Sequence, residues 1–238
     1  RQVIDEPAGD WTVPPPFPAF DAIDSRSFGA FLWRVFGEGR RANPFAIDAV
    51  SRPLLASSGC PHRCVFCSSN PGWRDVGRKP YRVVPLSVLE DWLVLIRGIG
   101  GRKIVFLDDV ANLRPDFDGV LDILERLDLK AEFPNGLRAD CLEPRQIDRL
   151  AERISLLSLS METANPRHLK ERVGKAMDPA AVEAAVQAAA SAGLPSMVHY
   201  IIGFPWETPT NVQGTLSKAW DLYERFGAIP AVQYATQP

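Results

Sequence analysis

The chain has 238 residues, of which 46% are hydrophobic, so it is long enough for one large domain or two small ones with a substantial core. Its 27 Lys and Arg against 29 Asp and Glu give a formal charge of -2 without blocks of one sign, which excludes a purely electrostatic binder. No apolar run approaches the roughly 20 residues that cross a bilayer, and no signal peptide pattern opens the chain. We therefore expect a cytoplasmic protein with neither a membrane partner nor a nucleic-acid partner.

The first 52 residues are predicted to be a proline-rich leader followed by an irregular segment. Five prolines and three large aromatic residues fall within the first twenty positions, a composition that favours extended chain. The chain begins with Arg1 and stops at Pro238 inside a run that reads as ordered, so we expect a segment of a longer protein. Residues 53–238 are expected to form its core domain.

From residue 53 onward, short strand-like runs alternate with helix-like runs. The six runs that read as strands are residues 53–57, 103–107, 130–134, 154–160, 196–202 and 228–235. Six such units joined by right-handed crossovers build a parallel sheet covered by helices, either doubly wound or curled into a barrel.

Several helix boundaries carry their own signals. Ser87 with Glu90 predicts a capping box, in which each side chain satisfies a free backbone donor of the other residue. Asp178 and Thr208, each followed by proline, predict N-caps. Gly193 follows an alanine-rich run and predicts the end of that helix.

Polar residues gather where the predicted strands end, which is where parallel α/β folds place their chemistry. Three cysteines follow the first strand. The later strands are followed or finished by Asp108 and Asp109, by Asn135 and Arg138, by Ser158, Ser160 and Glu162, and by residues 203–207. In the fourth strand the two-residue period puts both serines and the glutamate on one face and apolar residues on the other. We expect the polar face to line a cavity.

Cys60, Cys64 and Cys67 form the spacing C-x3-C-x2-C within one short segment, which argues for a ligand cluster rather than disulfides. Three thiolates can hold three irons of a 4Fe-4S cluster and leave the fourth iron open, as a catalytic metal requires. The alternative is zinc held by these cysteines with His62 or a distant ligand, although His62 lies too near Cys60 to reach the same tetrahedral centre. Cys141 is expected to be a partly buried thiol.

The cysteine triplet, with Phe66 just before its last member, resembles the radical S-adenosylmethionine (radical SAM) superfamily, and the resemblance extends from about Leu54 to Tyr234. Further similar segments are NGLRAD at 135–140, SMET at 160–163 with GK at 174–175, and HYIIGFPWET at 199–208. The chain is most similar to the cobalamin-binding branch. The resemblance implies a partial (β/α)6 barrel of the TIM type with the cysteine loop at its open end.

The resemblance also implies cofactors. A 4Fe-4S cluster on the three cysteines would bind S-adenosylmethionine, and an external one-electron donor such as flavodoxin or ferredoxin would reduce it. Cleavage of the sulfonium then yields a 5′-deoxyadenosyl radical that takes a hydrogen atom from the substrate inside a shielded barrel.

The leader resembles the connector that follows an N-terminal cobalamin-binding domain. We therefore expect cobalamin-dependent methyl transfer or rearrangement, with cobalamin held by a domain outside this segment. One alternative is a methylthiotransferase of tRNA or protein. The alternative of another class is a non-catalytic zinc-binding or redox interaction module.

By the same resemblance, Asp108 or Asp109 would hold the amino group of S-adenosylmethionine, the alternative being a helix N-cap or loop carboxylate. Glu162, Ser158 and Ser160 would bind its ribose hydroxyls or its amino acid moiety. Their alternative is a structural hydrogen-bond network.

Lys175 and Arg138 could each pair with the carboxylate of S-adenosylmethionine, and a structural ion pair is the alternative for both. Gly203 and Ile202, in the fifth-strand motif, would approach and pack on adenine. Glu207 would brace that loop, and His199 is expected to be a satisfied core histidine.

Overall fold

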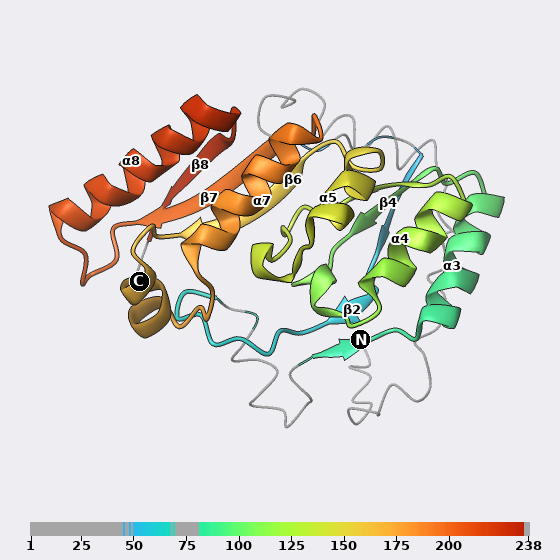
Figure 1. The fold of residues 1–238 in the computed structure, drawn as a ribbon. Helices are drawn as coiled ribbons and strands as arrows, with labels where there is room; N and C mark the ends of the chain where they lie inside the picture. Colours follow the sequence, from blue (N-terminus) through green and yellow to red (C-terminus); the bar gives the residue numbers. More distant parts are fainter. Residues whose placement is uncertain (1–44, 46–47, 49, 68, 70–80, 236–238) are drawn as a thin grey trace, which may run out of the picture.

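The computed structural model describes residues 45, 48, 50–67, 69 and 81–235, and the predicted leader lies almost wholly outside these residues. Figure 1 shows strands in one row with helices packed along it. In chain order the main elements are β1 (Ser51–Leu54), α3 (Leu86–Gly98), β4 (Lys103–Phe106), α4 (Phe117–Arg126), β5 (Lys130–Glu132), α5 (Pro144–Ala151), β6 (Leu157–Glu162), α7 (Pro179–Ser191), β7 (Ser196–Ile202), α8 (Pro209–Phe226) and β8 (Ile229–Tyr234). The smaller elements are β2 (Ser57–Ser58), β3 (Arg82–Val83), η3 (Ala111–Leu113), η4 (Ala139–Cys141), α6 (Pro166–His168) and the π-helical turn η5 (Leu169–Val173).

The main sheet consists of two parallel halves, ordered β1-β4-β5 and β6-β7-β8. Two isolated parallel bridges, Ala131 to Ile154 and Leu137 to Leu159, join β5 and the segment after it to β6. Six parallel strands in chain order, separated by helices, confirm the predicted α/β arrangement. All six strands therefore present their carboxyl ends along the same edge.

The core lies between the sheet and the helices that cover it. Leu93 of α3, Leu124 of α4 and Val186 of α7 are fully buried, and they belong to one cluster with Ile104 and Leu159 of the sheet. Burying an apolar side chain of this size contributes about 1.5–3 kcal/mol. This apolar layer fixes the strands and leaves their polar ends available for a site.

The predicted strands are confirmed with shifted boundaries. Residues 196–202 match β7 at both ends, whereas β1 begins at Ser51 and breaks off after Leu54. The fourth strand was predicted three residues too early, because Ile154 makes only an isolated bridge and β6 begins at Leu157. β6 also runs on to Glu162, past a bulge that no local pattern indicates.

Two predicted N-caps and one helix stop are confirmed. The Asp178 carboxylate accepts the backbone N–H of Ala180, and the Thr208 hydroxyl accepts that of Asn211. Gly193 follows α7 with a φ of 69°, in the left-handed region that ends helices.

The predicted capping box of Ser87 and Glu90 is wrong. α3 begins at Leu86, so Ser87 lies inside the first turn, and Pro85 occupies the N-cap position with a φ of -51°. Proline fixes a φ suited to a helix start without a side-chain cap. Glu90 instead pairs with Arg126 of α4 at 2.8 Å.

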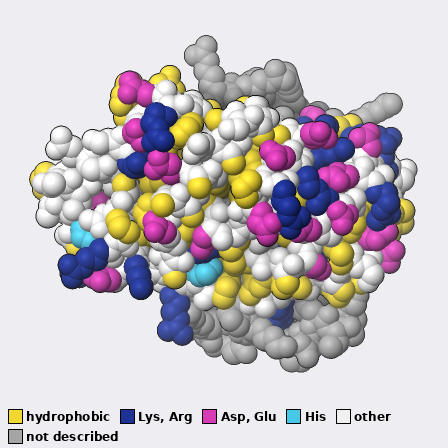
Figure 2. All heavy atoms as spheres, in the orientation of Figure 1, with side chains coloured by type: hydrophobic (Ala, Val, Ile, Leu, Met, Phe, Trp, Pro, Cys, Tyr) yellow, Lys and Arg dark blue, Asp and Glu magenta, His cyan; other side chains and the backbone are white. Residues whose placement is uncertain are grey.

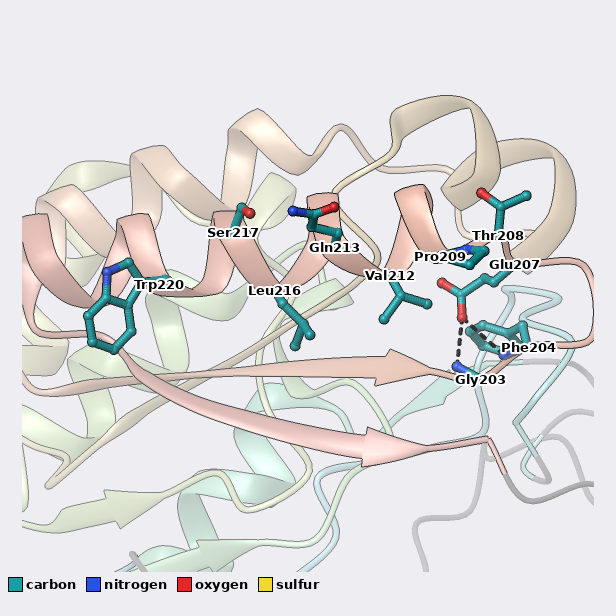
Figure 3. Close-up of a pocket in the computed structure, with 10 residues that line it drawn as sticks. All are labelled: Gly203, Phe204, Glu207, Thr208, Pro209, Val212, Gln213, Leu216, Ser217 and Trp220. Atoms are coloured by element: carbon teal, nitrogen blue, oxygen red, sulfur yellow. Dashed lines mark hydrogen bonds between the residues drawn. The ribbon is translucent and has the colours of Figure 1, made fainter.

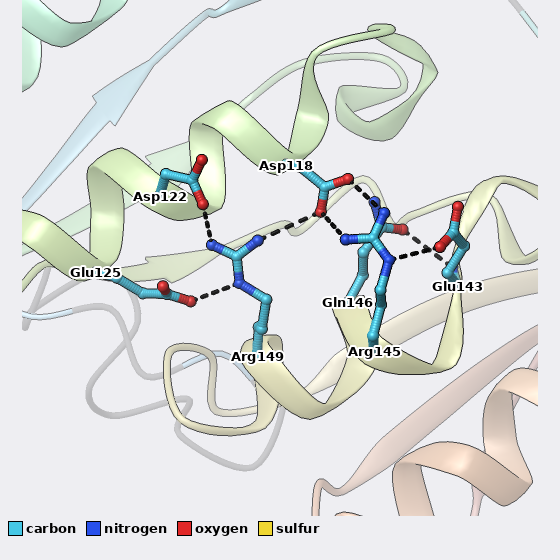
Figure 4. A network of polar contacts seen from close by, with 7 residues as sticks. All are labelled: Asp118, Asp122, Glu125, Glu143, Arg145, Gln146 and Arg149. Carbon is cyan, nitrogen blue, oxygen red and sulfur yellow. Dashed lines mark hydrogen bonds and ion pairs between the residues drawn. The ribbon is translucent and has the colours of Figure 1, made fainter.

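An ion-pair network joins α4 to α5 at the surface (Figure 4). Arg149 lies between three carboxylates, with Asp122 at 2.5 Å, Glu125 at 2.7 Å and Asp118 at 3.3 Å. Arg145 donates two further hydrogen bonds to Asp118. The carboxylates of Glu125 and Asp122, Glu125 first, raise the pKa of Arg149 further above its ordinary value.

None of the described helices combines the length and apolar character that a bilayer span requires.

Replacing Arg149 by Met is expected to lower the free energy of unfolding by about 1 kcal/mol, since its three carboxylates lose a common partner in a solvent-screened setting. Urea denaturation measures this, and the loss should shrink at about 1 M salt because exposed charges are screened. The control is Arg126→Met, which removes the pair with Glu90. Equal losses in both variants would contradict a network effect.

Candidate functional site

The three cysteines lie on one loop after β2, at the carboxyl edge of the sheet. Cys60 is buried, and Cys64 and Cys67 are partly buried. The backbone N–H of Cys67 donates to the carbonyl of Cys64 at 3.1 Å, which folds the second half of the motif into a tight turn. The predicted ligand cluster is therefore a single compact loop, with all three thiols free.

This loop is docked on the turn that follows η5. The backbone N–H of Val65 donates to the carbonyl of Val173 at 2.9 Å. Gly174 has a φ of 77°, and a Cβ there would lie 2.8 Å from the carbonyl oxygen of Arg63. Only glycine allows both this backbone conformation and this approach. Two segments more than a hundred residues apart in the chain thus meet through their backbones.

Burial and the neighbouring charges have opposing effects on the pKa values of the thiols. Burial raises the pKa values of the Cys60 and Cys64 thiols above their usual range, and each is raised further by neighbouring cysteines. The nearby Lys175 ammonium opposes this at Cys64, and the Arg138 guanidinium opposes it at Cys60. The loop therefore lies beside two fixed cations, which partly offset the effect of burial on the thiol pKa values.

Asp108 and Asp109, between which the sequence does not decide, lie in different surroundings. Asp108 is buried and accepts hydrogen bonds from the backbone of Ala56 and the hydroxyl of Ser57, and burial raises the pKa of its carboxyl. Asp108 therefore holds the base of the cysteine loop to β4. Asp109 is only partly buried, accepts a hydrogen bond from the Ser69 hydroxyl at 2.9 Å, and raises the pKa of Cys60.

Arg138 is buried and its guanidinium fork is already occupied. Its Nε and Nη2 atoms bind the carboxylate of Asp140 at 2.9 and 2.6 Å, and Nη2 also donates to the carbonyl of Ala176. This is the structural ion pair that the sequence left open as the alternative. Asn135, one turn earlier, donates to the carbonyls of Leu107 and Asp108 and ties the ends of β4 and β5 together.

Glu162 and Lys175 form a buried ion pair at the carboxyl end of β6. Lys175 Nζ lies 3.0 Å from Glu162 Oε1 and 2.6 Å from the carbonyl oxygen of Ser160, and the two side chains are only 9% and 7% exposed. The strand reaches this position through the bulge after Ser160 and a φ of 62° at Glu162. The bulge breaks the expected alternation, yet Glu162 still joins the polar group beside Cys64.

Ser158 and Ser160 differ in exposure. Ser158 is buried, and its hydroxyl lies 3.1 Å from Nε2 of His199 on β7, whereas Ser160 is partly exposed. Burial lowers the pKa of His199, which keeps the ring neutral. His199 is thus hydrogen-bonded, as expected, and it belongs to the polar face of the sheet beside Glu162 and Lys175.

The fifth-strand motif ends in a braced loop (Figure 3). Glu207 Oε2 accepts the backbone N–H groups of Gly203 at 2.7 Å and Phe204 at 3.0 Å, as expected for a brace. Gly203 has a φ of 88° and is exposed, and Ile202 before it is buried. An open groove of about 770 Å³ runs from this loop along α8 to Trp220.

A series of aromatic rings joins the cysteine loop to this braced loop and to α6. Phe66 lies 6.3 Å from Phe204, which stacks on Trp206 at 4.9 Å. The Trp206 ring in turn meets His168 edge-on at 5.1 Å. In the sequence, Phe66 stands out only as part of the cysteine motif, and the one signal for this contact is the pair of large aromatic residues that flank Pro205.

The model of the Radical SAM superfamily matches residues 54–219. The chain belongs to the radical SAM superfamily. Enzymes of this superfamily work with a 4Fe-4S cluster, S-adenosylmethionine and a reductant.

Among curated proteins, the chain is 31% identical over 182 residues to the uncharacterized methyltransferase PH0819 of Pyrococcus horikoshii, covering 71% of this chain and 36% of that protein. It is 29% identical over 123 residues to bacteriochlorophyllide d C-12(1)-methyltransferase of Chlorobaculum tepidum, covering 50% of this chain and 26% of that protein. The chain thus spans about a third and a quarter of the lengths of these two relatives.

Solved structures share the fold. The radical S-adenosylmethionine methyltransferase TsrM from Kitasatospora setae has a TM-score of 0.61 at 18% identity, covering 76% of this chain and 36% of that chain. The cobalamin-dependent radical enzyme OxsB has a TM-score of 0.58 at 20% identity, covering 76% and 27%. These likenesses confirm the predicted partial barrel of the radical SAM type.

The residues present fit a cluster with one open iron. The loop offers three thiols at the carboxyl edge, while Cys141 lies apart in η4 as the expected partly buried thiol, its sulfur 3.9 Å from an Asp140 oxygen. No three His, Cys, Asp or Glu side chains among the described residues converge on a single-ion position. Sulfurs that hold three different irons need not converge on one point.

Replacing Gly174 by Ala is expected to displace the cysteine loop, because the new Cβ meets the Arg63 carbonyl. Backbone amide exchange of Val65, whose hydrogen bond to Val173 spans this contact, should accelerate by at least tenfold. The control is Gly193→Ala, which has a similar positive φ of 69° but nothing within 4 Å. Unchanged exchange at Val65 in the Gly174 variant would contradict the docking.

Proposed function

We propose that this chain is the catalytic core of a radical SAM methyltransferase in which Cys60, Cys64 and Cys67 hold a 4Fe-4S cluster. The observation that carries the proposal is the three-thiol loop docked beside the buried Glu162 and Lys175 pair at the carboxyl edge of the sheet. When bound, the cluster and S-adenosylmethionine supply a 5′-deoxyadenosyl radical that takes a hydrogen atom from the substrate. The protein binds and orients S-adenosylmethionine and shields the radical from water.

Charge decides how the chain orients S-adenosylmethionine, whose amino acid moiety carries one ammonium and one carboxylate. Asp109 offers an acceptor for the ammonium, and the pair of Glu162 and Lys175 brings one carboxylate and one cation to the same edge for the amino acid moiety. Asp108 and Arg138 act one step back, because their polar atoms are occupied by Ser57 and Ala56 or by Asp140. They position the loops that carry the ligands.

The remaining predicted contacts lie along β6 and β7. Ser158 and Ser160 present hydroxyls on the polar face of β6, where ribose hydroxyls would find acceptors and donors. Ile202 and the exposed backbone of Gly203 provide an apolar surface and a close approach for adenine. Glu207 fixes that backbone by holding two of its N–H groups.

Methyl transfer is favoured by the relatives. Both curated relatives are named methyltransferases, and the solved structures of TsrM and OxsB contain cobalamin. We place cobalamin in a domain outside residues 53–238, preceding this core, so that the core supplies the radical chemistry. The boundary of the core at residue 53 belongs to the same proposal.

The Cys64→Ala variant is expected to lose the cluster and all cleavage of S-adenosylmethionine, because one of three iron ligands is gone. Anaerobic reconstitution with iron and sulfide, electron paramagnetic resonance of the reduced protein and mass spectrometry of 5′-deoxyadenosine measure this. The matched control is Cys141→Ala, which should retain both. An intact and active cluster in the Cys64 variant would refute the assignment.

The two neighbouring aspartates should respond differently to substitution. Asp109→Asn is expected to raise the Kd for S-adenosylmethionine about tenfold without changing the melting temperature, since it removes a charge near the ligand. Asp108→Asn should lower the melting temperature instead, because Asp108 holds buried partners. Calorimetry of binding and of unfolding separates the two, and the reverse pattern would exchange their roles.

A further inference from the structure

A side-chain hydrogen bond joins the segment after the third cysteine to the end of β4. The hydroxyl of Ser69, two residues after Cys67, donates to Oδ1 of Asp109 at 2.9 Å. The two residues lie 40 positions apart in the chain, so only the folded protein brings them together. No described residue donates a hydrogen bond to the other carboxylate oxygen, Oδ2, and the Asp109 side chain is only partly buried. One oxygen of Asp109 is therefore fixed, and the other is available to a ligand.

Asp109 has neither of the common structural uses of a loop aspartate. The helical turn that follows, η3, begins at Ala111 with Val110 as its N-cap, so Asp109 does not cap it. Asp109 also makes no ion pair with any described residue. Acidic side chains elsewhere do pair, and Figure 2 shows Asp and Glu next to Lys and Arg on the face that it draws. The ion-paired acidic residues of α4, α7 and α8 include Asp118, Asp122, Glu125, Glu183 and Asp221.

The unpaired carboxylate borders the proposed iron site. Asp109 lies close enough to Cys60 to contribute to the raised pKa of that thiol. Negative groups placed side by side without a cation are unfavourable, and nothing in the fold of the loop requires this one. A cationic ligand on Oδ2 would balance the charge through a charge-assisted hydrogen bond. The ammonium of S-adenosylmethionine is such a cation.

We propose that Ser69 is a positioning residue for S-adenosylmethionine, because its hydroxyl holds Oδ1 of Asp109 and leaves Oδ2 for the ammonium of the ligand. The proposal rests on the function proposed above. The terminal torsion of an aspartate is broad, so a hydrogen bond to one oxygen restricts where the other oxygen lies. Ser69 follows Cys67 directly in the same segment, so one contact ties the ammonium site to the iron ligands. Ser69 then matters only for ligands that carry the amino acid moiety.

Two other roles for Ser69 fit the contact less well. A purely structural bond gains most where it is buried, whereas this one is only partly buried, and the Gly174 and Phe204 contacts already hold the cysteine loop. Direct donation from Ser69 to the ligand would need the proton that its hydroxyl gives to Asp109. Both roles are outcomes of the test.

The test is a double-mutant cycle with two ligands. The variants are Ser69→Ala, Ser69→Thr, Asp109→Ala and the double alanine variant. The matched control is Ser191→Ala, which removes an exposed hydroxyl that donates to the Gln187 carbonyl at the end of α7. All are reconstituted anaerobically, iron and sulfide contents confirm the cluster, and scanning calorimetry gives the melting temperature. Equilibrium dialysis measures the Kd for S-adenosylmethionine and for 5′-methylthioadenosine, which keeps the adenosine part and lacks the amino acid moiety.

Ser69→Ala is expected to raise the Kd for S-adenosylmethionine about fivefold, the size of one lost hydrogen bond. The Kd for 5′-methylthioadenosine and the melting temperature should not change. Ser69→Thr keeps the hydroxyl and should stay within about twofold of the wild type. In the Asp109→Ala background, removing the Ser69 hydroxyl should add nothing, because the two residues act as one unit. Ser191→Ala should match the wild type throughout.

The contrary results separate the other roles. An unchanged Kd for S-adenosylmethionine in Ser69→Ala would overturn the proposal. An equal loss for both ligands, with a lower melting temperature, would make the bond purely structural. A further loss in the Asp109→Ala background would mean that Ser69 contacts the ligand directly. Each of these leaves the proposed function intact, whereas failure of the reconstituted wild type to cleave S-adenosylmethionine with dithionite would refute that function.

Discussion

The buried pair of Glu162 and Lys175 is the interaction on which the rest of the site depends. Two charges removed from water cost several kcal/mol unless they are paired and hydrogen-bonded, and here Lys175 also binds the Ser160 carbonyl. The pair holds the turn before Lys175 against the end of β6. That turn presents Gly174 and the carbonyl of Val173 to the cysteine loop. Loss of one partner would leave an unpaired buried charge and free the surface on which the cysteine loop rests.

Features that depend on neighbours along the chain could be predicted from the sequence. β7 was placed at both ends because its apolar run lies between clear turn signals, and the caps at Asp178 and Thr208 followed from an oxygen acceptor before proline. The Ser87 capping box failed because the N-cap is Pro85, two residues earlier, and makes no side-chain cap. The bulge near Glu162 also could not be predicted, because it depends on the register of β6 against β7. Local chemistry sets the elements, and tertiary pairing moves their ends.

The residues of the site also divide into those that local spacing indicates and those whose role depends on distant contacts. The spacing of three cysteines within eight residues indicates a ligand cluster. The choice between Asp108 and Asp109 instead depends on Ser57 and Ala56, more than fifty residues away. Arg138 looked equally suited to a ligand and to an ion pair, and only the folded chain brings Asp140 and Ala176 onto its fork. Residue type therefore narrowed the candidates, and contacts distant in sequence decided which polar atoms remain available.

The cysteine loop is held from two directions. The Gly174 contact fixes its backbone against the turn before Lys175, and the Phe204 ring packs on Phe66 between the second and third cysteines. The proposed cluster needs three thiols at fixed positions, because each of three irons would take one of them. Drift of this eight-residue loop would move the thiols away from the buried pair of Glu162 and Lys175. The chemistry of the proposed site is thus a consequence of how tightly the loop is docked.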